Sequence, residues 1–165
     1  MLLNRWLSDH PQDTKVRLAL ATALQATGSE LEAAQTYERI LDIDGSNLVA
    51  LNNLALLHYR RGDSQAVAVA KRAFDLAPER AEVQDTYGWM LVQTGQIERG
   101  LSLLRKARRA RPDLRDIEYH YAAALAQSGD REEAVRSLKA LLAEPTAFSE
   151  RANAERLVQS LAAEN

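Results

Sequence analysis

Three histidines, His10, His58 and His120, are the residues best suited to acid–base chemistry or metal binding in this chain of 165 residues. They lie far apart in the sequence, and no His-Glu-x-x-His or comparable ligand spacing connects them. Cysteine is absent, which excludes a disulfide framework, a thiolate metal site and a cysteine nucleophile. We therefore interpret the histidines as surface or partly packed helix residues, and expect neither a metal nor a cofactor.

Glycines and carboxylates give no stronger indication of catalysis. No Gly-Lys-Ser or Gly-Lys-Thr follows Gly88, Gly95 or Gly100, so a phosphate-binding loop is not indicated. Glu132 and Glu133 are adjacent at an expected helix start, where the helix dipole favours negative charge. We predict that the chain has no catalytic residues and is not an enzyme.

A cluster of positive charge lies between Arg99 and Arg115, where seven basic residues accompany the single acid Asp113. Such a cluster can bind phosphate, an anionic lipid or an acidic partner. It can also be the solvated face of a helix whose cations favour the C-terminal end of the dipole, which is the interpretation we prefer. The net charge of −2 argues against a nucleic-acid partner. The basic residues are Arg99, Arg105, Lys106, Arg108, Arg109, Arg111 and Arg115.

The composition indicates an all-α protein. Ala and Leu, both strong helix formers, number 28 and 25, whereas aromatic residues make up only 5% of the chain. Charged residues make up 27% and hydrophobic residues 46%, which argues against disorder. The most apolar segment, 48–59, is interrupted by Asn52, Asn53 and His58, so no membrane span is expected.

Glycine and proline recur with one period. Gly28, Gly62, Gly95 and Gly129 are separated by 34, 33 and 34 residues, and Pro78, Pro112 and Pro145 by 34 and 33. Glycine suits a helix end that needs a positive φ, and proline stops the next helix. The spacing predicts repeated helical hairpins. Candidate N-caps precede their helices, namely Asp13, Ser46 and Asp113 for first helices and Ser29, Asp63 and Asp130 for second helices.

The segment TYGWMLVQTGQIERGLSLLRKARRARP, residues 86–112, resembles the tetratricopeptide repeat, a helix–turn–helix unit of 34 residues. The resemblance implies an α-solenoid of antiparallel helix pairs that forms a right-handed superhelix. We expect the second helix of a truncated repeat at 1–13, four repeats at 14–47, 48–80, 81–114 and 115–147, and a capping helix at 148–165.

The two ends of the chain lead to different expectations. Residues 2–9 lack a preceding first helix, so Leu3, Trp6 and Leu7 are expected to lose part of their cover and to allow self-association. We therefore expect the chain to be a fragment of a longer repeat array. The helix expected from Ser149 to about Ala163 has a polar outer face, typical of the natural end of such an array.

Stacked helical hairpins make a concave groove, which first helices line in the family that the chain resembles. Trp and Tyr offer a large contact area, Asn52 can bond a peptide backbone, and Asp85 can pair with a cation. The alternative for Trp89 or Tyr119 is packing between adjacent repeats. The resemblance places Asn52, Leu56, Tyr59, Asp85, Trp89, Val92, Tyr119 and Ala123 in this groove, with Leu18, Thr22 and Gln25 in the first repeat.

The resulting functional prediction is a non-enzymatic scaffold that binds a peptide or protein segment. The alternatives are a purely structural or self-associating segment of a larger array and, more remotely, binding of nucleic acid or lipid through residues 105–111. Residues 85–95, 117–130 and 148–161 also resemble a bacterial tetratricopeptide lipoprotein family of the PEP-CTERM protein-sorting and exopolysaccharide system. That resemblance implies the cell envelope and a lipid-anchored parent on the periplasmic side. Without it the expected compartment is the cytoplasm.

Overall fold

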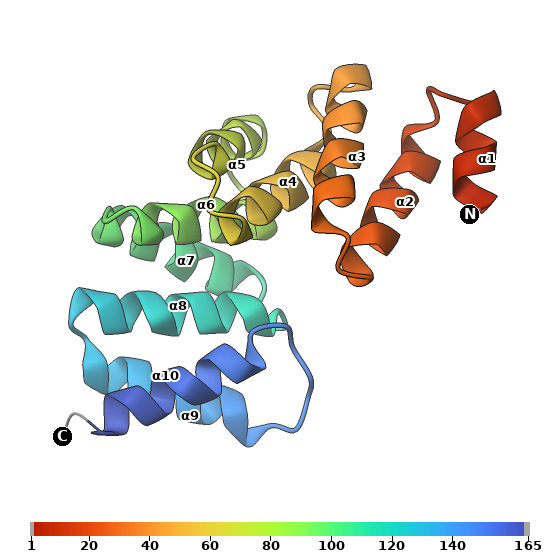
Figure 1. Ribbon diagram of the computed structural model, residues 1–165. Helices are drawn as coiled ribbons and strands as arrows, with labels where there is room; N and C mark the ends of the chain where they lie inside the picture. The colour runs from red at the N-terminus through yellow and green to blue at the C-terminus, as the bar shows by residue number, and fades with distance from the viewer. Residues whose placement is uncertain (1, 164–165) are drawn as a thin grey trace. The chain divides into compact units, whose positions relative to one another are not determined.

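The computed structural model describes residues 2–163, and within this range the chain forms ten α-helices and no strand (Figure 1). The helices follow one another as antiparallel pairs joined by short turns, which confirms the predicted all-α helical-repeat fold. Their bounds are α1 Leu2–Asp9, α2 Thr14–Ala26, α3 Glu30–Ile43, α4 Leu48–Arg60, α5 Ala66–Leu76, α6 Ala81–Gln93, α7 Ile97–Ala110, α8 Arg115–Ser128, α9 Arg131–Ala143 and α10 Arg151–Ala163.

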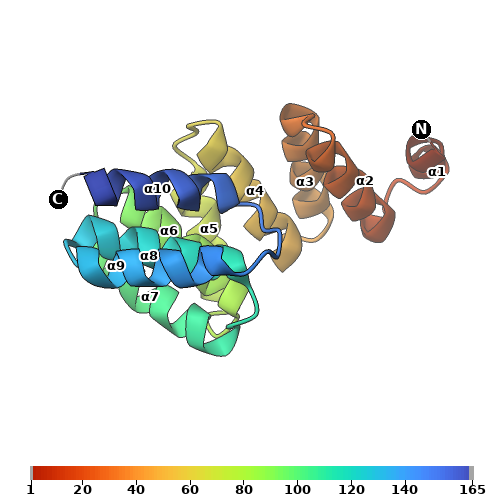
Figure 2. The same ribbon diagram turned by 90° about the horizontal axis from the view of Figure 1, so that it is seen from below.

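The helices belong to two compact units. Unit 1 contains α1 to α5 and ends at Pro78, and unit 2 contains α6 to α10 and begins at Glu79. In each unit every helix contacts the next one along the chain. In unit 2, α8 also contacts α6 and α10, and Figure 2 shows α10 alongside α8 and α9. Ala154 and Leu161 of α10 are buried.

The periodic glycines all end a first helix in the same way. Gly28, Gly62, Gly95 and Gly129 have φ values of 78°, 69°, 83° and 93°, a region that favours glycine. After α2, the amide of Ser29 donates to the carbonyl of Leu24 and the amide of Gly28 to that of Gln25. This is the Schellman arrangement, and the other three turns repeat it. The predicted equivalence of these four bends is confirmed.

The predicted N-caps are only partly correct. The side chains of Asp13 and Asp130 accept bonds from the amides three residues ahead, at 3.0 and 3.4 Å. The N-cap of α4 is Asn47 rather than Ser46, whose amide and hydroxyl both donate to Asp44. Leu114 rather than Asp113 occupies the N-cap position of α8, and the carboxylate of Asp113 pairs with Arg111 at 2.7 Å.

Two of the remaining expected caps also act differently. Ser29 stands at the N-cap position of α3 but makes no side-chain capping bond. Asp63 accepts a bond from the amide of Gln65 at 2.9 Å, and Gln65 directly precedes α5. The reason is local: the turn, rather than the residue type alone, decides which side chain faces the free amides.

Small residues let paired helices approach closely. In unit 1, Ala21, Ala33 and Ala50 are fully buried in a core with Tyr37 and Ile40. In unit 2 the approach is closer still, because α6 and α7 meet at two glycines. A Cβ added to Gly100 would lie only 2.5 Å from the carbonyl oxygen of Gly88 and 2.5 Å from Cγ2 of Val92. The backbones of α6 and α7 therefore leave no room for a side chain at this point.

We predict that Gly100→Ala destabilises the protein, although alanine is normally the better helix former. The added methyl group would force α6 and α7 apart, and we expect the free energy of unfolding to fall by about 1–3 kcal/mol in urea denaturation. Gly45→Ala is the control, because its Cβ would meet only the flexible end of Arg72 at 3.2 Å and the carbonyl of Leu41 at 3.5 Å. Equal stability of the two variants would contradict the close contact.

Candidate functional site

The first candidate surface is a stripe along α4 in unit 1. Asn52, Leu56 and Tyr59 are four and three residues apart, which places them on one face of the helix, and all three are half-buried. Val49 lies three residues before Asn52 on the same face and is 48% exposed. The prediction missed Val49, although the same helical spacing indicates it. We call these four residues the α4 stripe.

A buried tyrosine positions α4 against its neighbours. The hydroxyl of Tyr37, a fully buried residue of α3, donates to Oε1 of Gln25 in α2 at 3.2 Å. The same hydroxyl oxygen accepts a bond from Nδ2 of Asn53 in α4 at 3.1 Å. Gln25, predicted as a groove residue, therefore takes part in a hydrogen-bond network that joins three helices. Oδ1 of Asn52 is buried and has no hydrogen-bond partner among the residues described.

The predicted groove residues of unit 2 form an interior cluster instead of an open surface. The Trp89 ring of α6 stacks on the His120 ring of α8, with ring centres 4.7 Å apart, and lies 6.2 Å from the Tyr119 ring. Nδ1 of His120 is 2.8 Å from Oδ1 of Asp85. Trp89, Tyr119 and Asp85 are each only 8% exposed. Trp89 and Tyr119 therefore pack between adjacent repeats, which is the alternative that the sequence left open for them.

Val92 and Ala123 are also interior residues. Cγ2 of Val92 lies against α7 where Gly100 makes room for it, and the side chain is 1% exposed. Ala123 is 4% exposed. Contacts within unit 2 therefore bury both side chains. Any part that they take in binding stays a prediction.

Two of the three histidines, His58 and His120, lie beside carboxylates that sequence reasoning did not find. Besides the His120–Asp85 pair, Nδ1 of His58 lies 2.9 Å from Oδ2 of Asp63. The His120–Asp85 pair could have been predicted from its separation of 35 residues. This is close to one repeat and places the two residues on successive first helices. The His58–Asp63 pair could have been predicted from the turn glycine Gly62, which folds Asp63 back over the end of α4.

The pKa of His120 reflects two opposing effects. Burial lowers it, because an imidazolium loses hydration in the interior. The charge of Asp85 and its hydrogen bond raise it, with smaller contributions from Glu150 and Asp116. The attraction prevails, and the pKa of His120 lies above the ordinary value of 6.5. Below its raised pKa, His120 is charged and forms an ion pair with Asp85 that joins α6 to α8.

Within the basic cluster, several cations have partners. Arg108 pairs with Glu118 at 2.5 Å, and Arg111 pairs with Glu82 and Asp113 at 2.9 and 2.7 Å. Arg99 bonds Gln96, and Arg115 pairs with Glu144. Arg105, Lys106 and Arg109 are exposed, and no hydrogen-bond or ion-pair partner is found for them among residues 2–163. The preferred interpretation, a solvated helix face, therefore holds for only part of the cluster.

The N-terminal helix exposes apolar surface, but of Leu3, Trp6 and Leu7 only Trp6 is exposed as predicted. Leu2 is 88% and Trp6 48% exposed, whereas Leu3 is half-buried and Leu7 is buried. The Trp6 ring stacks on His10 with centres 4.0 Å apart, and its N–H donates to Asp13 at 3.0 Å. Self-association through this helix stays a prediction, and light scattering that finds a monomer at high concentration would count against it.

Comparison with known proteins identifies the repeats. The tetratricopeptide repeat family matches residues 49–147. The chain belongs to the tetratricopeptide repeat family. Among curated proteins, the Vi polysaccharide export protein VexE of Salmonella typhi is 33% identical over 113 residues. These residues are 64% of this chain but only 17% of VexE, so the chain spans a small part of that relative.

Solved tetratricopeptide repeat structures share the fold. TTC0263, a thermophilic TPR protein of Thermus thermophilus, matches with a TM-score of 0.73 and 20% identity, over 97% of this chain and 87% of its own. YrrB, described as a TPR protein with an unusual peptide-binding site, matches with a TM-score of 0.68 and 17% identity, over 88% and 75% of the two chains. At these identities the likeness shows the fold alone.

The tetratricopeptide repeat fold is that of a protein-interaction scaffold and is generally non-catalytic. Among residues 2–163, no three histidine, aspartate or glutamate side chains are grouped closely enough to hold a metal ion. No helix in the same range is long and apolar enough to cross a membrane. The described repeats expose apolar and guanidinium groups, among them Val49, Arg105 and Arg109.

We predict that the His120–Asp85 pair makes stability depend on pH. Because the pKa of His120 is raised in the folded state, its stabilisation is complete below about pH 6.5 and is lost as the pH rises through the folded-state pKa. The free energy of unfolding, measured in urea, should therefore fall on the alkaline side of pH 6.5. Asp85→Asn should remove this fall. Asp42→Asn, which changes an exposed carboxylate on α3, should leave it unchanged, and a fall that survives Asp85→Asn would contradict the assignment.

Proposed function

We propose that the chain is a non-enzymatic scaffold that binds an extended or helical segment of a partner protein along the α4 stripe of unit 1. The observation that carries this proposal is the stripe itself, since Val49, Leu56 and Tyr59 offer accessible apolar surface on one helix face. In a protein whose fold serves interaction, such a row of side chains is suited to anchoring a peptide.

The polar group of the α4 stripe, the side-chain amide of Asn52, is suited to binding a peptide backbone. An amide such as Asn52 can donate to a peptide carbonyl and accept from a peptide N–H. Its Oδ1 atom has no partner among the residues described, and a buried acceptor without a donor destabilises a structure by about 1–3 kcal/mol. A peptide N–H that reaches this oxygen on binding would supply the missing hydrogen bond and would fix the orientation of the bound segment.

We also propose a bacterial cell-envelope setting, within an apparatus for polysaccharide export and protein sorting. Two observations support it: the resemblance of the C-terminal segments to lipoproteins of the PEP-CTERM and exopolysaccharide system, and the similarity to VexE, which is named for polysaccharide export. The scaffold would then hold a protein component of that apparatus. The alternative, a purely structural or self-associating segment of a longer array, is favoured only by the exposed apolar residues of α1.

Peptide binding is tested with a library of random short peptides, from which binders are selected and measured by fluorescence anisotropy. We expect selected peptides to contain apolar anchors, and Leu56→Ala and Tyr59→Ala each to weaken binding roughly ten-fold, the loss of about 1.4 kcal/mol of contact. Leu76→Ala is the matched control, because it removes a 50% exposed leucine from α5 in the same unit. Equal effects of Leu56→Ala and Leu76→Ala would exclude the α4 stripe.

The envelope setting is tested in the bacterium that carries the gene. We expect the tagged parent protein to sediment with the envelope fraction, and deletion of its gene to reduce exported polysaccharide. A parent protein found only in the soluble cytoplasmic fraction, with normal polysaccharide in the deletion strain, would contradict the setting without affecting the peptide-binding proposal.

A further inference from the structure

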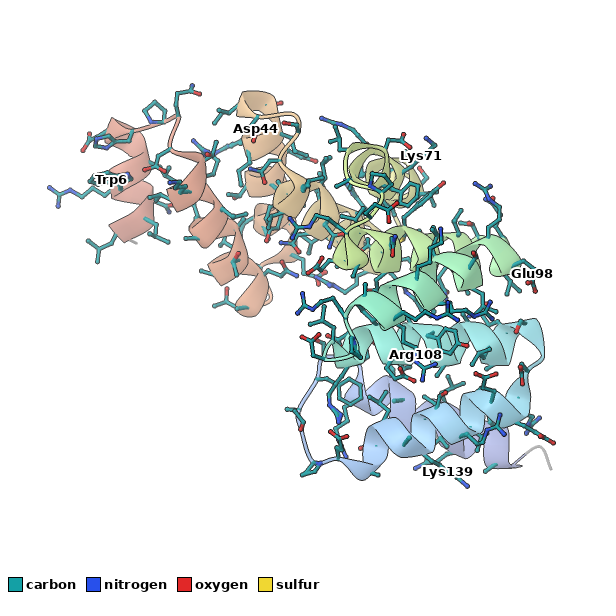
Figure 3. All side chains as sticks on the ribbon, turned by 180° about the vertical axis from the view of Figure 1, so that it is seen from behind. Trp6, Asp44, Lys71, Glu98, Arg108 and Lys139 are labelled. Carbon is teal, nitrogen blue, oxygen red and sulfur yellow. The ribbon has the colours of Figure 1, made fainter. Side chains whose placement is uncertain are left out.

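A hollow lies among α7, α8 and α9 of unit 2, and none of its lining residues belongs to the α4 stripe. Its volume is about 650 Å³, within the range of sites that hold small ligands or a few residues of a peptide. Figure 3 labels Arg108, which belongs to its lining. The lining consists of Arg105, Arg108 and Arg109 of α7, Pro112 of the following turn, Glu118 and Tyr121 of α8, and Glu133 of α9.

The inner wall of the hollow is built by charge pairing. Nε of Arg108 donates to Glu118 at 2.5 Å, and its guanidinium lies 4.7 Å from the centre of the Tyr121 ring. The hydroxyl of Tyr121 donates to Oε1 of Glu133 at 3.2 Å. These contacts hold Arg108 in place and partly satisfy both glutamates. A ligand therefore meets a preorganised wall rather than mobile side chains.

Two arginines of the lining are exposed. Arg105 and Arg109 are one helical turn apart on α7, and no ion-pair or hydrogen-bond partner is found for either among residues 2–163. Like charges at this spacing repel each other, although the C-terminal end of the α7 dipole favours the cation at Arg109. Their guanidinium groups present the planar forks that match carboxylates. An anion placed between them would relieve the repulsion and would gain charge-assisted hydrogen bonds.

We propose that this hollow binds an acidic segment of a partner protein, with side-chain carboxylates held between Arg105 and Arg109. Charge complementarity favours a carboxylate-bearing peptide. Its backbone N–H groups and any basic side chain can face Glu118 and Glu133, whereas the closely spaced phosphates of a nucleic acid would be repelled by these two carboxylates. The Tyr121 ring is covered by Arg108 and is 3% exposed, so it offers no surface on which a base or sugar could stack.

The probe is a fluorescein-labelled peptide of alternating Glu and Gly, measured by fluorescence anisotropy at low salt against the same peptide with Gln in place of Glu. We expect the chain to bind the Glu peptide and not the Gln peptide. The double variant R105Q/R109Q should lose ten-fold or more in affinity. The control R136Q/K139Q removes two exposed cations from α9 and so changes the net charge equally, and it should retain most of the affinity.

A third variant is expected to strengthen binding of the Glu peptide rather than weaken it. Glu133→Gln removes one negative charge from the wall while keeping an oxygen for the Tyr121 hydroxyl, and it should strengthen binding of the Glu peptide. Circular dichroism should give the same helix content for all variants, because the changed side chains lie at the surface or keep their hydrogen bond.

Three outcomes would overturn the proposal. Equal losses in the two double variants would mean that only net charge matters. Equal binding of the Glu and Gln peptides would show that the hollow does not recognise carboxylates. Tighter binding to single-stranded DNA or to phosphatidylserine vesicles, lost in R105Q/R109Q, would assign the hollow to a phosphate-bearing partner instead.

Discussion

Close approach between paired helix backbones is the constraint on which this structure depends. An isolated hairpin of two short helices buries little apolar surface, so each pair must pack tightly and must pack against its neighbours. Small residues at the contact make this geometry attainable, and the pair Gly88 and Gly100 represents its limit, where a single methyl group would collide with a carbonyl oxygen. The left-handed glycine that ends each first helix turns the chain sharply enough for the second helix to return along the first.

The close packing of helices also explains why charged side chains lie in the interior of unit 2. Once α6 and α8 lie side by side, the polar positions of α6 face the next first helix rather than solvent. Asp85 and His120 satisfy each other there, and Trp89 covers the imidazole with its ring. A buried carboxylate without this partner would be strongly destabilising, whereas the pair, stacked and hydrogen-bonded, can be accommodated. The interface between α6 and α8 is thus specified by charge complementarity as well as by shape.

The accessible chemistry of the two units differs in kind. In unit 1 the exposed face of α4 is apolar with one amide, and it is suited to a segment with apolar anchors. In unit 2 the aromatic side chains of α6 and α8 lie inside, and an accessible feature is a hollow with arginines at its rim. Apolar contact is insensitive to salt, but guanidinium–carboxylate attraction is screened by it.

The sequence by itself determined the repeat, because the spacing of Gly28, Gly62, Gly95 and Gly129 reports a backbone requirement that only glycine meets readily. It also determined the helix pairs, the last helix and the apolar exposure of Trp6, all of which follow from local periodicity. Only the tertiary structure decided which side of each first helix stays accessible. Asp85, Trp89 and Tyr119 have residue types that suit a ligand groove equally well, but contacts between residues about one repeat apart in the chain turned them inward. Helical spacing places residues on a common face, but it does not say whether solvent or a neighbouring helix meets that face.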